Sequence, residues 1–147
     1  MSSVTDLHGA VKCGDVTRLK ELLEADPALA NARSETDARG TYPLHVAAEF
    51  GQSIAARVLL DFGANVALLD LENDAIALGW AAFFGRPSVV QVLLEANSDP
   101  SQRNKNGLTP LGCAIEGTQG RWKRFSNASF DEWRQCAAAI KLRGGVE

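Results

Sequence analysis

Hydrophobic residues recur along this chain at the spacing expected of short amphipathic helices. Two segments show the spacing most clearly, one starting near residue 16 and the other near residue 89. Their apolar positions are Val16, Leu19, Leu22 and Leu23 in the first segment, and Val89, Val92 and Leu93 in the second. Residues three and four apart lie on one face of an α-helix, so each segment is predicted to be a helix with one buried face.

The same pattern returns with a period of about 34 residues. Residues 40–66 align with residues 74–99 through three anchors, each shifted by 34 positions. The anchors are Ala47-Ala48 with Ala81-Ala82, Gly51 with Gly85, and Leu59-Leu60 with Leu93-Leu94. Further copies begin near residue 5, with offsets of 37, and near residue 107, with offsets of 32 to 33. A repeat of this length predicts a stack of similar units.

Each copy contains the signals of a short helix, a glycine turn, a second helix and an extended loop. Thr5 and Thr109 can each cap a first helix through the side-chain hydroxyl. Pro43 and Pro110 stand at first helical positions, where the missing N–H is harmless. A two-helix unit cannot hide its apolar face alone, whereas stacking on a neighbour does so, and the paired alanines would let the helices approach closely.

The period and three short motifs resemble the ankyrin repeat. The motifs are Pro-Leu-His at 43–45, Thr-Pro-Leu at 109–111 and Leu-Leu-Asp-Phe-Gly-Ala-Asn-Val at 59–66. The resemblance implies an all-α fold, a solenoid of stacked helix-turn-helix units with extended loop or β-turn fingers. It also implies a single ankyrin-repeat domain over 1–147, with repeats at about 4–36, 37–70, 71–103 and 104–147.

Several positions depart from the pattern of the family. In the family, the motif threonine caps the helix and the motif histidine ties neighbouring loops together. Here Tyr42 stands in the threonine place of the second copy, and Gly79 and Gly112 stand in the histidine place of the third and fourth copies. We therefore expect a less regular and only moderately stable stack. His45 keeps its place and is expected to bond to the backbone.

The last copy carries an insertion of about fifteen residues, at about 118–130. Its basic and aromatic run is Arg121, Trp122, Lys123, Arg124 and Phe125. Ser129 is a candidate N-cap for a helix that begins near residue 131. One interpretation is a binding loop for an acidic partner, with Trp122 as its anchor. The other is a lid whose aromatic residues cover the open apolar end of the last copy.

Composition and charge narrow the function classes. The 147 residues carry a net charge of −3, and 46% of them are hydrophobic. An acidic chain is not suited to neutralising a phosphate backbone, so nucleic acid is not expected as a partner. The sequence has no leader-like start and no long apolar stretch, which leads us to expect a soluble, cytoplasmic protein without a membrane span. We also expect a monomer.

The cysteines and histidines do not suggest a metal or a cofactor. Cys13, Cys113 and Cys136 are odd in number and far apart, so they are expected to be buried thiols. The chain has only two histidines, and a zinc site would need other ligands brought together from distant places. No cofactor and no metal are therefore expected.

The resemblance also implies where a partner binds, because ankyrin-like stacks usually bind through their loop tips and the exposed face of the first helices. The implied loop-tip contacts are Arg39, Thr41, Glu72, Lys105 and Leu108, and the implied first-helix contacts are Glu49, Phe50, Phe83, Phe84, Ile115 and Glu116. The insertion adds Arg121, Trp122, Lys123 and Arg124. The phenylalanines form an exposed apolar row if they face outward, and are core if they tuck under a loop. Trp80 is expected in the core.

Three function classes follow. The first is a non-catalytic protein-protein interaction module, an adaptor, scaffold or inhibitor that holds an unidentified protein on a concave face. The second is an electrostatic binder of a phosphorylated, nucleic-acid or lipid-headgroup ligand through the basic insertion. The third is catalysis by His8, His45 or Cys13, but the five-residue spacing of His8 and Cys13 is poor for helical neighbours. Asp70 lies with other acids in a loop, where a solvated cluster is expected. We favour the first class.

Overall fold

The computed structural model describes residues 2–147 of the protein. Within that range the chain forms eight α-helices, one 3-10 helix and no strand, which confirms the predicted all-α fold. The helices are α1 (Ser3–Cys13), α2 (Val16–Ala25), η1 (Pro27–Asn31), α3 (Pro43–Phe50), α4 (Ser53–Asp61), α5 (Ala77–Phe84), α6 (Pro87–Glu95), α7 (Pro110–Thr118) and α8 (Phe130–Leu142). None of these helices has the length and hydropathy of a membrane-spanning segment.

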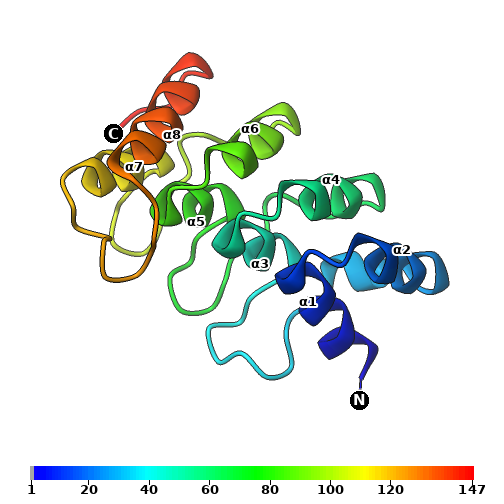
Figure 1. Ribbon diagram of the computed structural model, residues 1–147. Coiled ribbons are helices and arrows are strands. Elements are labelled where there is room, and N and C mark those ends of the chain that lie inside the picture. Colours follow the sequence, from blue (N-terminus) through cyan, green and yellow to red (C-terminus); the bar gives the residue numbers. More distant parts are fainter. Residues whose placement is uncertain (1) are drawn as a thin grey trace.

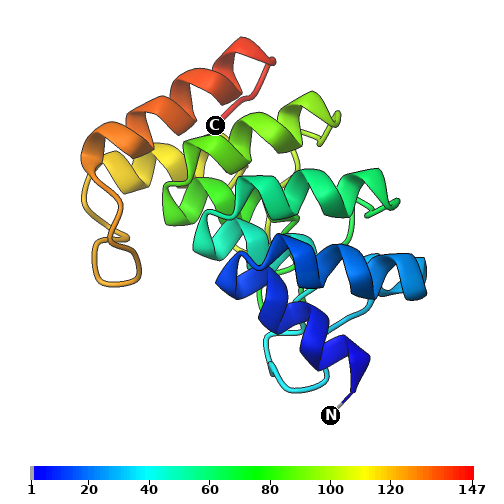
Figure 2. The ribbon, with the colours of Figure 1, turned by 45° about the vertical axis from the view of Figure 1, so that its right-hand side comes forward.

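The helices form antiparallel pairs that stack in chain order, with the two termini at opposite ends of the stack (Figures 1 and 2). Helices α1, α3, α5 and α7 contact one another in an inner row, and α2, α4, α6 and α8 form an outer row. The loops that join successive pairs project from one side of the stack. We call residues 32–42 the first finger, 62–76 the second and 96–109 the third. The side formed by the fingers and the inner row is the inner face.

Helix caps follow the sequence signals with one exception. Ser2, not Thr5, caps α1, since its hydroxyl accepts the Thr5 backbone N–H at 3.1 Å; the prediction for Thr5 was wrong because the helix begins three residues earlier. Thr109 caps α7 by accepting the Gly112 N–H at 3.1 Å, as predicted. Ser129 caps α8 by accepting the Glu132 N–H at 3.1 Å, which confirms that prediction and places the helix start at residue 130.

The turn between the two helices of a pair needs glycine. Gly51 and Gly85 end α3 and α5 in the left-handed region, each with φ of 68°, where residues with a side chain are strained. This conformation sends the chain back so that the second helix lies against the first. The glycine anchors of the repeat therefore mark turns, as the sequence indicated.

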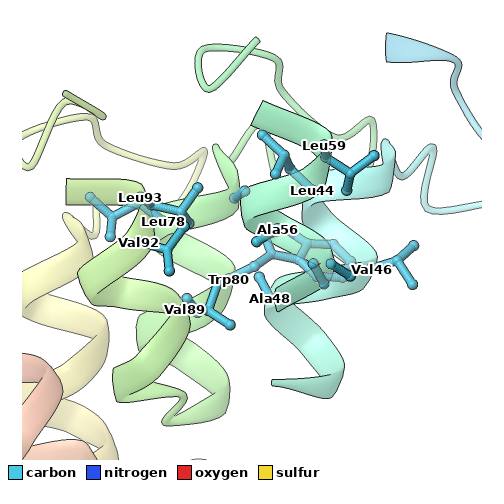
Figure 3. Packing of buried hydrophobic residues seen from close by; sticks show 14 of the residues in the cluster. Leu44, Val46, Ala48, Ala56, Leu59, Leu78, Trp80, Val89, Val92 and Leu93 are labelled. Atoms are coloured by element: carbon cyan, nitrogen blue, oxygen red, sulfur yellow. The ribbon is translucent and has the colours of Figure 1, made fainter. Parts of the chain in front are cut away.

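The core runs the length of the stack between the two rows of helices (Figure 3). Ala47, Ala48, Ala81 and Ala82 are completely buried, which confirms that small residues sit where inner helices approach one another. Larger side chains from the outer row, such as Leu59 and Leu93, fill the space beside them and are also fully buried. Burial of each such leucine contributes about 1.5–3 kcal/mol.

Each finger is held by one acidic or amide side chain of its own. Asp37 accepts the Arg39 N–H at 2.9 Å in the first finger, and Asn104 accepts the Leu108 N–H at 3.0 Å in the third. Asp70 accepts the Ala75 N–H at 3.0 Å in the second. Only 1% of Asp70 is exposed, so the expectation of a solvated cluster was wrong for this residue, which satisfies buried donors instead.

Backbone hydrogen bonds also join neighbouring fingers. The Leu71 N–H and the Glu72 N–H donate to the Arg39 carbonyl at 2.9 Å and 3.2 Å. The Lys105 N–H donates to the Asn73 carbonyl at 2.9 Å. The three fingers are therefore tied to one another as well as to their own helices.

Candidate binding groove on the inner face

A groove of about 440 Å³ lies on the inner face, between the fingers and helices α5 and α7. Its lining residues are Arg39, Glu72, Asn73, Ala75, Gly79, Trp80, Phe83, Phe84, Asn104, Asn106, Leu108, Cys113, Trp122 and Phe125. The fingers contribute its polar and amide side, and the inner helices with the insertion contribute its aromatic side. This volume lies in the range of ordinary ligand-binding pockets.

A continuous row of aromatic rings forms one wall of the groove. The ring centroids are 5.8 Å apart for Trp80 and Phe84, 5.0 Å for Phe84 and Phe83, and 4.5 Å for Phe83 and Trp122. Phe125 continues the row at 5.7 Å from Phe83 and is 56% exposed. Because offset and edge-to-face contacts are the favourable geometries for aromatic pairs, the rings hold one another in place.

Arg39 lies at the base of the groove and is fixed on several sides. Its guanidinium donates to both carboxylate oxygens of Asp37, with the shortest bond at 2.8 Å, and to both of Glu49, with the shortest at 2.9 Å. It also lies over the ring of Trp80, 4.9 Å from its centroid. Asp37 and Glu49 hold the pKa of Arg39 above its ordinary value, and the Arg39 hydrogen bonds hold the pKa of Asp37 below its own.

The floor of the groove is open because Gly79 has no side chain. In the second pair the equivalent residue is His45, which is 1% exposed and donates through Nε2 to the Ala75 carbonyl at 2.8 Å, while its Nδ1 accepts the Tyr42 N–H at 3.1 Å. A Cβ at Gly79 would meet only the Ala75 Cβ, at 3.7 Å. The missing imidazole therefore leaves free space beside Trp80.

The insertion forms the far wall of the groove and is anchored to the end of α5. The indole N–H of Trp122 donates to the Cys113 carbonyl at 2.8 Å. The Ser126 hydroxyl donates to the Phe84 carbonyl at 2.6 Å, and the Trp133 indole N–H donates to the Phe83 carbonyl at 3.0 Å. These two carbonyls belong to the last turn of a helix, where backbone acceptors lack intrahelical donors. Ser126 of the insertion and Trp133 of α8 satisfy them.

Of the four aromatic residues of the lid interpretation, Trp133 is buried as expected, Trp122 is half-buried, and Phe125 and Phe130 are exposed. Trp133 is completely buried and packs against the backbone of Gly117, where a Cβ would lie only 2.2 Å from the Trp133 ring. Phe125 and Phe130 remain 56% and 40% exposed. They stay on the surface because the insertion folds onto the end of α5, where Trp133 alone enters the core.

The groove brings together six of the predicted contact residues. They are Arg39, Glu72, Phe83, Phe84, Leu108 and Trp122. The predicted residues outside its lining are Glu49, Phe50, Lys105, Ile115, Glu116, Arg121, Lys123 and Arg124. Phe50 is 39% exposed beneath the Lys12 ammonium, which lies 5.2 Å from its ring. Trp80 is 5% exposed, as predicted for the core, and yet reaches the groove with one edge.

Thr41 is the predicted contact that the structure corrects. Its side chain is completely buried, and its hydroxyl donates to Asp37 at 3.3 Å inside the first finger. The resemblance implied a loop-tip position for Thr41, but the finger tip lies further out, at residues 38–39. Sequence reasoning also missed Asn73 and Phe125 as lining residues.

The two histidines serve the scaffold. His8 bonds through Nε2 to the Ala32 carbonyl at 2.8 Å, as His45 does to Ala75. Burial lowers the pKa of both imidazoles, and the bonds to the carbonyls oppose that shift. Within residues 2–147, no three His, Cys, Asp or Glu side chains gather in a way that could hold a metal ion.

The thiols divide into one exposed and two buried groups. Cys13 is exposed, which contradicts the expectation that all three are buried, because it stands at the end of α1 on the open end of the stack. Burial raises the pKa of both Cys113 and Cys136 to about 12, so these two stay protonated at neutral pH.

Comparison with known proteins agrees with the architecture. Residues 7–104 match the family model for ankyrin repeats in three copies. The chain is 31% identical over 137 residues to the tyrosine-protein kinase Shark of Drosophila melanogaster, covering 88% of this chain and 14% of that protein. It is 39% identical over 88 residues to mouse Rabankyrin-5, covering 58% of this chain and 7% of that protein.

A bacterial relative is similar over a shorter stretch. A putative ankyrin repeat-containing protein of Treponema pallidum is 40% identical over 79 residues, covering 54% of this chain and 26% of that protein. The chain thus spans about a quarter or less of each of these relatives. Ankyrin repeats are generally protein-interaction modules. With its stacked helix pairs, its tied fingers and the match over residues 7–104, the chain belongs to the ankyrin-repeat family.

Proposed function

We propose that this protein is a non-catalytic interaction module that holds a partner protein in the groove of its inner face. The observation that carries the proposal is the open aromatic wall, in which Phe83, Phe84, Trp122 and the 56% exposed Phe125 line a space of about 440 Å³. Exposed apolar surface of this kind usually marks an interaction site, and aromatic residues dominate binding energy at interfaces.

The rigidity of the groove supports the same function. Hydrogen bonds from Leu71 and Glu72 to Arg39, and from Lys105 to Asn73, fix the fingers relative to one another before any partner arrives. The insertion is fixed by its bonds to Phe83 and Phe84. A preformed surface loses little conformational entropy on binding, so more of the contact energy becomes affinity.

The charges of this surface favour a protein partner over a phosphate-bearing ligand. Arg39 is neutralised by Asp37 and Glu49. Lys123 donates to the Ala128 carbonyl at 3.2 Å and lies over the Phe130 ring at 4.7 Å. An electrostatic site would depend on Arg39, Lys105, Arg121, Lys123 and Arg124. Of these cations, Arg39 and Lys123 already have partners, and Arg124 lies over the Phe125 ring, 5.6 Å from its centroid.

The last helix pair belongs to the same proposed binding stack. Helices α7 and α8 lie beyond residue 104, where the family match ends. They nevertheless pack on α5 and α6 in the way that each earlier pair packs on its neighbour. We assign them to a fourth repeat, with boundaries at about 4–36, 37–70, 71–103 and 104–147, whose insertion completes the groove.

Affinity capture from a native lysate tests the proposal with a matched pair of variants. Phe125→Ser removes an exposed ring of the groove wall, and Ile54→Ser removes a side chain of comparable exposure, 64%, on the outer row. We expect Ile54→Ser to retain the proteins that the wild type retains, and Phe125→Ser to lose them. Capture should persist at raised ionic strength, because an aromatic interface is little screened by salt. Equal capture by both variants would refute the proposal.

A further inference from the structure

We infer that the groove receives an aromatic side chain of the partner protein, stacked on the free face of the Arg39 guanidinium. This inference rests on the proposed function and adds the chemistry of the anchor. It follows from how Arg39 is held, from the rings opposite it and from the space above Gly79.

The edges of the Arg39 guanidinium are already occupied. Its Nε–H donates to Asp37, its two Nη2 hydrogens donate to Asp37 and Glu49, and one Nη1 hydrogen donates to Glu49. Four of the five N–H groups of an arginine are thus engaged. A carboxylate or phosphate, which binds arginine through these edges, finds at most one free donor.

One face of the guanidinium is covered, and the side chain remains partly exposed to the groove. Trp80 covers one face, with its ring centroid 4.9 Å from the guanidinium carbon. The side chain keeps 36% of its area exposed and lines the groove. A guanidinium presented by its face attracts the negative face of an aromatic ring and lacks that attraction for an aliphatic chain.

The remaining walls suit a flat ring. Phe83 and Phe84 meet at 75°, so their faces and edges offer edge-to-face contacts to a third ring. On the finger side, the amides of Asn73 and Asn106 line the groove and can bond the polar edge of a tryptophan or tyrosine, or the partner backbone beside it. Aromatic contacts and a few amides together favour an aromatic anchor.

Gly79 supplies the room for the ring. It lines the groove next to Trp80, and its missing side chain has only the Ala75 Cβ within 4 Å. Because Gly79 lines the groove and a Cβ there meets no backbone atom within 4 Å, we expect a leucine at this position to occupy groove space. Gly9 offers a matched control, because it also lies inside an inner helix, in α1, and has no neighbour within 4 Å.

The three tryptophans provide the signals for a test that needs no identified partner. Trp80 and Trp122 line the groove, whereas Trp133 does not. We would titrate the ¹⁵N-labelled protein with N-acetyl-tryptophanamide and, separately, with N-acetyl-leucinamide, and follow the three indole N–H resonances. The tryptophan probe should shift the signals of Trp80 and Trp122 and leave that of Trp133 unchanged. It should bind about three- to fivefold more tightly than the leucine probe.

Variants then distinguish the contribution of the Arg39 face to probe binding from the contribution of the groove as a whole. Gly79→Leu should abolish the shifts from both probes, and Gly9→Leu should leave them as in the wild type. Arg39→Lys keeps the charge and a point-charge attraction to a ring but loses the planar face, so the preference for tryptophan over leucine should decrease. Equal affinity of the wild type for the two probes, or an unchanged preference in Arg39→Lys, would overturn the inference.

The outcomes for this inference and for the proposed function are distinct. If the probes bind equally while Phe125→Ser still loses captured proteins, the groove is an interface without an aromatic anchor. If Phe125→Ser retains those proteins, the interface itself lies elsewhere.

Discussion

The second and third helix pairs have the same architecture but use one inner-helix position in opposite ways. In α3 the position holds His45, which is buried and joins its own helix start to the second finger through Ala75. In α5 it holds Gly79, which bonds nothing through a side chain and opens the groove beside Trp80. From the sequence, glycine in the histidine place of the family pattern predicts only a less stable stack. The comparison shows that the same departure also opens the binding space.

The two pairs also differ in which side chains donate hydrogen bonds to the backbone carbonyls at the ends of α3 and α5. Arg86, from the turn of the third pair, donates to the Glu49 carbonyl at the end of α3 at 3.0 Å, as Gln52 does to the Lys12 carbonyl of α1. At the end of α5 the donors are instead Ser126 and Trp133, from the insertion and α8. The end of α5 thus depends directly on the insertion and α8, whereas the end of α3 is bonded by Arg86 of the regular repeat, which in turn donates to Asn127 of the insertion at 3.0 Å.

Replacing Trp133 should have the largest effect on stability. Trp133→Ala removes a fully buried ring and leaves the Phe83 carbonyl without its donor. We expect the free energy of unfolding to fall by about 3–5 kcal/mol, measured by urea denaturation followed by circular dichroism. Phe125→Ala is the control and should change it by less than about 0.5 kcal/mol, because that ring is mostly exposed. Similar values for both variants would show that Trp133 does not support the third pair.

Replacing His45 should have the second-largest effect on the free energy of unfolding. His45→Ala deprives the Tyr42 N–H of its acceptor and the Ala75 carbonyl of one donor, both in buried surroundings. A loss of about 2–3 kcal/mol is expected in the same denaturation experiment. His8→Ala should lose less, since His8 is 9% exposed and makes a single bond. A larger loss for His8→Ala would contradict this ranking.

Acid should weaken the first two pairs selectively. Burial lowers the pKa of His8 and His45 below the ordinary value of 6.5, so the folded state holds both imidazoles neutral while the unfolded state takes up protons first. The contribution of these two neutral imidazoles to the free energy of unfolding is complete above pH 6.5 and is lost as the pH falls below that value. The urea midpoint should therefore decrease as the pH falls below 6.5, and the double variant His8→Asn/His45→Asn should flatten that dependence. An equal slope in the double variant would contradict the assignment.

Loss of the α8 cap should have the smallest effect. Ser129→Ala removes the acceptor of the Glu132 N–H, while the Glu132 carboxylate still accepts the N–H of residue 129 at 2.9 Å. We expect a loss of about 1 kcal/mol by thermal or urea denaturation. Ser88→Ala, at an exposed position in α6, serves as the control and should be neutral. If the two substitutions behave alike, the cap does not stabilise α8.

The fold could be predicted because it depends on features that recur locally. The period, the glycines at 51 and 85 and the paired alanines each specify a turn or a close approach, and the structure has them where expected. Errors arose where a side chain's burial depends on neighbouring segments. Thr41 and Asp70 are polar residues in loops, yet both are enclosed by their own fingers.

The groove could be predicted only in part. The resemblance implied Arg39, Glu72 and the phenylalanines of α5, because these positions follow from the repeat register. Phe125 could not be placed, since the path of the insertion is set by contacts of Ser126 and Trp133 with α5 rather than by any local pattern. The sequence did contain one signal of the groove, Gly79, which stands in the histidine place of the repeat and forms the groove floor because it has no side chain.

The most direct test of the central claim is to fill the groove rather than to remove its walls. Capture from the native lysate would be compared among the wild type, Gly79→Leu and Gly9→Leu, with amide NMR spectra verifying that all three are folded. The account predicts that Gly9→Leu retains the wild-type partners and that Gly79→Leu retains none of them. Retention of the same proteins by a folded Gly79→Leu variant would contradict it.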